Sequence, residues 1–181
     1  MQLPHLRSPA ARCALSLALL WSGLFGADAL ASDKGDGATL VVVLDAGDQQ
    51  EFASQRTYDA LVRELARRGF AATPLETDAM YERTTASRLD AARAAGDSSN
   101  IVLVETQARF FAQIAGRYRW TVTAEVTIAP SDEGEPLVRT VEVPVFLLYD
   151  HEREAEALAE ASVMLARKVG SVARDYRDGE R

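Results

Sequence analysis

Cysteine and histidine are scarce in this chain of 181 residues, which contains only Cys13, His5 and His151. A single cysteine cannot form a disulfide within the chain, and thiolate zinc sites need several cysteines. His5 precedes the expected processing site described below, so a Ser-His-Asp triad would have to use His151. Because His151 lies between Asp150 and Glu152 at an expected helix start, we interpret it as a solvated residue of the first turn.

Short catalytic and phosphate-binding motifs are absent as well. The nucleophile elbow G-x-S-x-G, the phosphate loop G-x-x-x-x-G-K-[ST] and the dinucleotide fingerprint G-x-G-x-x-G do not occur. The acidic segment Asp132–Glu135 lacks the alternating aspartates and distal glutamate of a calcium loop. The sequence therefore predicts no cofactor, and a non-catalytic protein is the first expectation.

The first 31 residues have the pattern of a secretory signal peptide. His5, Arg7 and Arg12 form a positive flank, the run Cys13–Gly26 is uncharged and mostly apolar, and Ala29–Ala31 supplies small residues for cleavage. The apolar run has 14 residues, whereas a membrane-spanning helix needs roughly 20. We expect cleavage after Ala31 and export to the periplasm; an uncleaved anchor helix is the alternative.

Cleavage would leave residues 32–181, enough for one domain with its own core. We expect a linker over residues 32–38, a single domain over 39–177 and a frayed tail over 178–181. Removing Arg7, Arg12 and Asp28 leaves 18 basic and 26 acidic residues, a net charge of −8. This acidic balance argues against nucleic acid or an anionic membrane as the main partner, because both attract lysine and arginine.

Hydrophobic periodicity indicates a strand and two helices in the first half of this domain. The valine-rich run Thr39–Asp45 is typical of a strand buried on both faces. A helix is expected from about Glu51 to Arg68, with Gly69 as its C-terminal cap. A brief strand at Phe70–Thr73 and a helix within 78–95 follow.

Three strands in succession are expected next, at Ile101–Ile114, Arg117–Ala129 and Leu137–Tyr149. Apolar and polar residues alternate along them, which indicates antiparallel strands with one buried face. In the first of these strands, one face is expected to comprise Val102, Val104, Ala108, Phe110, Ala112 and Ile114. A last helix begins after Asp150.

The resulting order, β-α-(β)-α-β-β-β-α, predicts an α/β fold of the two-layer α+β sandwich type. One mixed sheet would contain an antiparallel meander, and the helices would cover one of its faces. We expect much of the other face to be exposed.

Two groups of residues are candidate sites. Asp45 and Asp48 lie at the C-terminal end of the first strand, where ligands bind in open α/β sheets, so they could hold Mg²⁺ or Ca²⁺ or divide acid and base roles. Aspartate is also common in turns and helix caps, which is the simpler interpretation.

The second group is a predicted interaction surface that comprises Arg109, Arg117, Arg119 and Pro144. The three arginines flank one expected hairpin and could bind an anionic ligand or the acidic face of a partner. Alternatively, they pair across strands with Glu125 or Glu142. Pro144 lacks an amide donor, which predicts a sheet edge or a bulge.

Several segments resemble a group of small envelope domains with an anticodon-binding-like α/β sandwich. The segments are Thr39–Asp45, Leu65–Phe70, Leu89–Glu105 and Tyr118–Ile128. The group includes the N-terminal domain of TolB, the periplasmic domain of CsgG and the LpoB-type activators of peptidoglycan synthases. The resemblance implies a non-catalytic accessory module that binds another envelope protein.

A second resemblance, to LptE-type lipopolysaccharide-assembly lipoproteins, is based on Val42, Leu44, Asp45, Gly47 and Asp48. It implies an alternative function as a carrier of a lipid or other apolar ligand. LptE and LpoB proteins are anchored through a lipid-modified cysteine, which this chain lacks at its expected cleavage site. A small exported metal-assisted enzyme that uses Asp45 and Asp48 is the third hypothesis.

Overall fold

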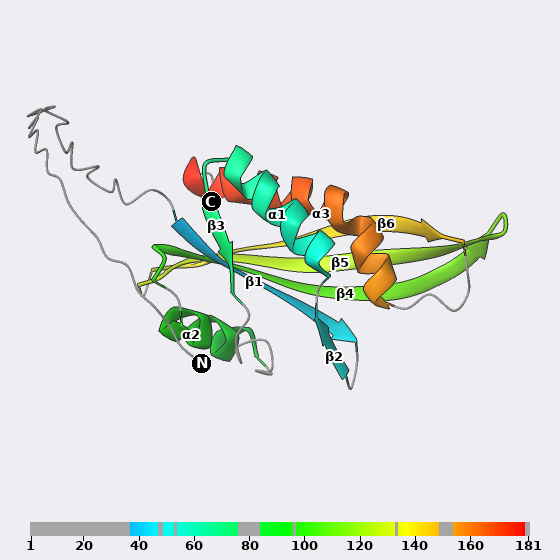
Figure 1. The fold of residues 1–181 in the computed structure, drawn as a ribbon, viewed down its shortest axis with the longest axis horizontal. Coiled ribbons are helices and arrows are strands. Elements are labelled where there is room, and N and C mark those ends of the chain that lie inside the picture. Colours follow the sequence, from blue (N-terminus) through cyan, green and yellow to red (C-terminus); the bar gives the residue numbers. More distant parts are fainter. Residues whose placement is uncertain are drawn as a thin grey trace, which may run out of the picture. The chain divides into compact units, whose positions relative to one another are not determined.

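The computed structural model describes residues 37–46, 49–52, 54–75, 84–95, 97–132, 134–148 and 154–179. These residues belong to one compact unit that begins at Asp33. The elements in chain order are β1 (Gly37–Ala46), β2 (Gln49–Phe52), α1 (Gln55–Arg67), β3 (Ala71–Pro74), α2 (Thr85–Ala95), β4 (Asn100–Ile114), β5 (Arg117–Pro130), β6 (Leu137–Leu147) and α3 (Glu154–Arg177) (Figure 1).

One mixed sheet of six strands forms the centre of the fold, in the order β2-β1-β4-β5-β6, with β3 also paired to β1. The strand β1 is parallel to β3 and β4, and the meander β4-β5-β6 is antiparallel throughout. This arrangement confirms the predicted α/β sandwich with one mixed sheet and an antiparallel meander.

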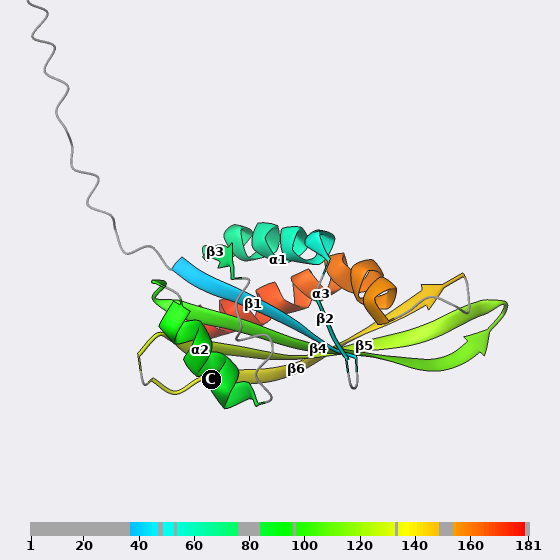
Figure 2. The ribbon, with the colours of Figure 1, turned by 60° about the horizontal axis from the view of Figure 1, so that its bottom comes forward.

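The helices α1 and α3 pack on one face of the sheet, which we call the inner face (Figure 2). Their apolar stripes, including Leu61, Leu65, Leu158 and Leu165, are buried against the even-numbered residues of β1, such as Val42. The Tyr58 hydroxyl donates a hydrogen bond to the Val42 carbonyl at 3.3 Å. Burial of these side chains away from water is the main stabilising contribution of the two layers.

The helix α2 covers part of the opposite face, which we call the outer face, and this corrects the prediction that all helices lie on one face. Leu89 and Ala92 of α2 pack against Val41, Val43 and Leu103 in a second apolar cluster. Both sets of alternating residues in β1 are apolar, so each face needs a cover. The prediction that β1 is buried on both faces is confirmed.

The first helix begins later than expected, because residues 49–52 form β2 and pair with the end of β1. The Thr57 amide donates to the Ser54 hydroxyl at 3.3 Å, so Ser54 is the N-cap of α1. The prediction that Gly69 caps the C-terminal end of this helix is confirmed, since Gly69 has a φ of 89°. The Gly69 and Phe70 amides donate to the carbonyls of Ala66 and Leu65, which is a Schellman motif.

A bulge in β4 makes the end of this strand point to a different face than the sequence predicts. Phe110 is opposite Trp120, whereas Ala112 is opposite Arg119, so Phe111 is an extra residue. The inserted residue reverses the alternation, and Ala112 and Ile114 point to the outer face instead of the inner face. Only the pairing with β5 reveals this change, because the sequence alternation alone continues without a break.

Candidate interaction surface

The structure places Arg109, Arg117, Arg119 and Pro144 on the outer face near the tip of the meander. Directly opposed residues of neighbouring strands point to the same face. Arg109 is opposite Thr121, which is opposite Pro144, and Arg119 is opposite Phe146. The strand β6 lies at the edge of the sheet, which agrees with the sheet edge that Pro144 predicts.

Large apolar side chains are exposed among these residues. The exposed fractions of Phe111, Ile114 and Phe146 are 64%, 43% and 49%. We define the hairpin patch as Arg109, Phe111, Ile114, Arg117, Arg119, Pro144 and Phe146. Contiguous exposed apolar groups with a polar rim are typical of binding surfaces.

The three arginines have no ion pairs within the described residues, so the expected pairing with Glu125 or Glu142 is not observed. The Arg119 guanidinium carbon instead lies 4.6 Å from the centre of the Phe111 ring. The Arg119 Nε is buried without a hydrogen-bond partner in the described structure. The hairpin patch therefore combines positive charge with exposed aromatic carbon, a composition favoured at protein interfaces.

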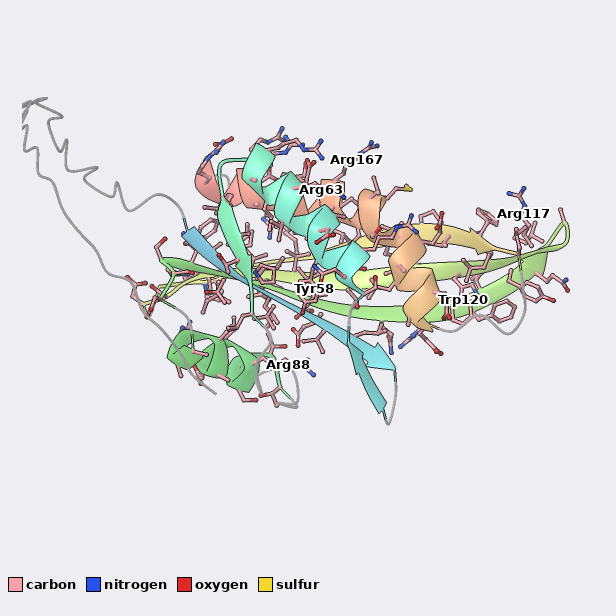
Figure 3. The ribbon with its side chains drawn as sticks, viewed as in Figure 1. Tyr58, Arg63, Arg88, Arg117, Trp120 and Arg167 are labelled. Carbon is pink, nitrogen blue, oxygen red and sulfur yellow. The ribbon has the colours of Figure 1, made fainter. Side chains whose placement is uncertain are left out.

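An aromatic cluster supports the patch from the inner face. The Phe110 ring centre lies 6.2 Å from that of Tyr118 and 5.9 Å from that of Trp120. Trp120 is buried in the main core, whereas Phe110 is 53% exposed. In Figure 1 the β4–β5 tip extends beyond the two helices, and Figure 3 shows Arg117 there.

The carboxylate pair Asp45 and Asp48, expected at the end of the first strand, stays a prediction. The backbone of Asp45 is part of β1 and pairs with Gln50 of β2, while Asp48 and His151 lie outside the described residues. Within the described ranges, no group of three or more His, Cys, Asp or Glu residues could hold a metal ion.

A second polar site under α2 was not expected from the sequence. Arg88 and Glu105 form an ion pair whose side chains are 11% and 14% exposed, and the Thr85 hydroxyl donates to Glu105 at 2.8 Å. Beside it lies an open pocket of about 220 Å³, which Gln107 and Glu125 also line. Because Arg88 and Glu105 are separated by 17 residues, no local motif could reveal the pair. The ion pair links α2 to β4 of the sheet, and Figure 3 labels Arg88.

None of the helices among the described residues is long and apolar enough to cross a membrane. In this part of the chain, the fold and its surfaces define an α/β sandwich with an exposed arginine-and-aromatic face. No protein-family model matches the chain, and no curated protein matches it.

Several solved structures are similar in part. A PelC dodecamer from Paraburkholderia phytofirmans is 15% identical, with 78% of this chain and 89% of that chain covered and a TM-score of 0.46. The hypothetical protein CT253 from Chlamydia trachomatis is 10% identical, with coverages of 78% and 98% and a TM-score of 0.45. Lipoprotein GNA1162 from Neisseria meningitidis is 15% identical, with coverages of 75% and 99% and a TM-score of 0.40. These values are too low to support a shared family or function.

Proposed function

We propose that this chain is a non-catalytic interaction module of the bacterial cell envelope, exported through its N-terminal signal and cleaved after Ala31. Its single domain, residues 39–177, would act in the periplasm. The observation that supports this function best is the hairpin patch, where three arginines without ion pairs in the described structure surround exposed Phe111, Ile114 and Phe146.

The partner that fits the hairpin patch is an envelope protein with an acidic surface that also offers apolar contacts. Arginine forms bidentate hydrogen bonds with carboxylates, and its guanidinium stacks on aromatic rings, as Arg119 does on Phe111. The chain as a whole has a net charge of −7, so the positive patch is a local feature that would select the partner's binding orientation.

The described core does not favour the carrier hypothesis. The space between the sheet and the helices α1 and α3 contains closely packed buried residues, among them Leu40, Leu44, Leu61 and Leu165. A ligand pocket would need a volume of several hundred Å³, on the order of 300–1,000 Å³. The enzyme hypothesis based on Asp45 and Asp48 stays a prediction, because Asp48 lies outside the described residues.

The test is capture of the partner by the full chain with a C-terminal tag, expressed in its own host, cross-linked and identified by mass spectrometry. The variant Arg117→Glu/Phe146→Ser should lose the captured envelope protein. The control Arg139→Glu/Val138→Ser also replaces one arginine by glutamate and one exposed apolar residue by serine, at positions of β6 away from the tip, and it should retain the partner. N-terminal sequencing of the recovered chain should begin at Ser32.

Three results would contradict the proposal. Equal capture by both variants would exclude the hairpin patch, and recovery of only the chain itself would indicate self-association. Recovery of nothing from the envelope would exclude the interaction module. Each variant should keep the melting temperature of the unmodified chain, because the substituted side chains are exposed.

A further inference from the structure

A groove on the solvent side of the helix layer is separate from the hairpin patch. The helices α1 and α3 run parallel, since Arg56 pairs with Glu160 near their starts and Glu64 lies against Gly170 farther along. Between them is a hollow of about 130 Å³. Its lining residues are Ala60, Arg63, Glu64, Arg67, Val163, Ala166 and Arg167.

The groove has an excess of positive charge. Its one carboxylate, Glu64, has a side chain only 5% exposed and forms ion pairs with Arg67 at 3.3 Å and Arg68 at 3.1 Å. Arg63 donates from Nε to the Asp59 carbonyl at 3.0 Å, and neither Arg63 nor Arg167 has an ion pair within the described residues. Among the residues that the structure describes, these two guanidinium groups therefore line the same hollow without an ion-pair partner.

Interaction with the helix dipole does not explain the positions of Arg63 and Arg167. Cations in the last turn interact favourably with the helix dipole, and Arg67, Arg174 and Arg177 occupy such positions. Arg63 and Arg167 lie before the last turns, and Figure 3 shows both on the side of the helix layer away from the sheet. Like charges that line one hollow repel each other, and an anion bound between them offsets this repulsion.

We propose that the groove binds a phosphoryl group, with Arg63 and Arg167 as the two residues that contact its oxygens. The planar guanidinium matches phosphate oxygens in pairs of parallel hydrogen bonds, which makes arginine well suited to this ligand. Val163 lines the groove and is 47% exposed, and the neighbouring Met164 is 48% exposed. These apolar neighbours favour a phosphoryl group attached to an apolar body, as in a lipid headgroup, over free phosphate.

The overall acidity of the chain makes this site selective. A net charge of −7 repels anions at long range. Binding of phosphate therefore requires the local concentration of guanidinium groups in the groove, and removal of the two arginines should weaken it strongly. A general attraction to anions would not depend on these two positions.

The first experiment titrates the processed chain with inorganic phosphate. Calorimetry measures the binding, and NMR detects the shifts of backbone amide signals in α1 and α3. Arg63→Gln/Arg167→Gln should weaken binding about tenfold or more, since hydrogen bonds to charged groups contribute about 1.5–3 kcal/mol each. The control Arg56→Gln/Arg174→Gln removes two exposed charges from the same helices, outside the groove, and should bind as the unmodified chain does.

A second arm distinguishes the two sources of the phosphoryl group. If the ligand is a lipid headgroup, the unmodified chain should sediment with vesicles of phosphatidylcholine and phosphatidic acid, and not with vesicles of phosphatidylcholine alone. The variant Arg63→Gln/Arg167→Gln should sediment with neither. Binding of phosphate without vesicle binding would support a soluble phosphorylated ligand. Binding of neither probe, or an equal loss in the control variant, would overturn the proposal.

Discussion

At the tip of the hairpin between β4 and β5, Ala115 and Gly116 both have positive φ angles, of 49° and 77°. Two central residues with positive φ form the type I′ turn, which favours Asn-Gly. A left-handed conformation costs an L-residue such as alanine about 1–2 kcal/mol. Ala115→Asn should therefore stabilise the fold by about 0.5–1 kcal/mol, measured by urea unfolding.

Ala115→Ser is the matched control, because it adds a polar group without the same preference for the left-handed region. It should leave the free energy of unfolding nearly unchanged. Equal effects of Asn and Ser would show that polarity at this exposed turn, and not backbone conformation, controls the outcome.

Gly170 lies inside α3, where glycine is normally unfavourable by about 1 kcal/mol relative to alanine. Here a Cβ would lie 2.7 Å from Cγ of Glu64, whose buried carboxylate is held by Arg67 and Arg68. Gly170→Ala should destabilise the fold by about 1–3 kcal/mol, because overpacking outweighs the gain in helix propensity. Thermal unfolding measures the change.

The neighbouring substitution Ser171→Ala serves as the control for helix propensity, since Ser171 is only partly buried. Ser171→Ala should have a melting temperature within a few degrees of that of the unmodified chain. A Gly170→Ala variant that is more stable than the unmodified chain would contradict the close approach of α1 and α3.

Among the elements, α2 has the smallest contact with the sheet, and its buried residues are Arg88, Leu89 and Ala92. The Arg88–Glu105 ion pair therefore contributes much of its attachment. Arg88→Met should destabilise the fold by about 3 kcal/mol, because it leaves the Glu105 carboxylate largely buried without its cation. Hydrogen exchange should show that the amides of α2 lose protection first.

The double variant Arg88→Met/Glu105→Gln tests the cause. It removes both charges and keeps an acceptor for the Thr85 hydroxyl, so most of the lost stability should return. If the double variant is as unstable as Arg88→Met, the loss comes from packing of the arginine side chain and not from the unpaired carboxylate.

At the scale of the whole molecule, the two proposed binding surfaces and the helix α2 occupy different places on the described fold. The hairpin patch lies on the outer face at the tip of the meander, the groove with Arg63 and Arg167 lies on the helix layer, and α2 covers the outer face near β1. The two proposed binding surfaces therefore share no residue. Variants of one surface should leave binding at the other unchanged, which the capture and phosphate experiments measure independently.

Local periodicity in the sequence determined most of the elements. The alternation from Tyr118 to Ile128 indicated the strand β5 and its buried face. The spacing of Tyr58, Leu61 and Leu65 indicated the helix α1, whose apolar side is buried in the same core. Gly69 marked the end of that helix. These features depend on residues close together in the chain, so a sequence pattern contains the information they need.

Only the tertiary structure decided the features that depend on pairing between distant segments. The register of β4 against β5 includes a bulge at Phe111, which turns Ile114 to the outer face. The helix α2 packs on the outer face because the second apolar face of β1 is buried there. The arginines of the predicted surface were identified from the sequence, but their exposed aromatic neighbours on that face were not. The same is true of Arg63 and Arg167, because only the packing of α1 beside α3 brings their charges to one groove.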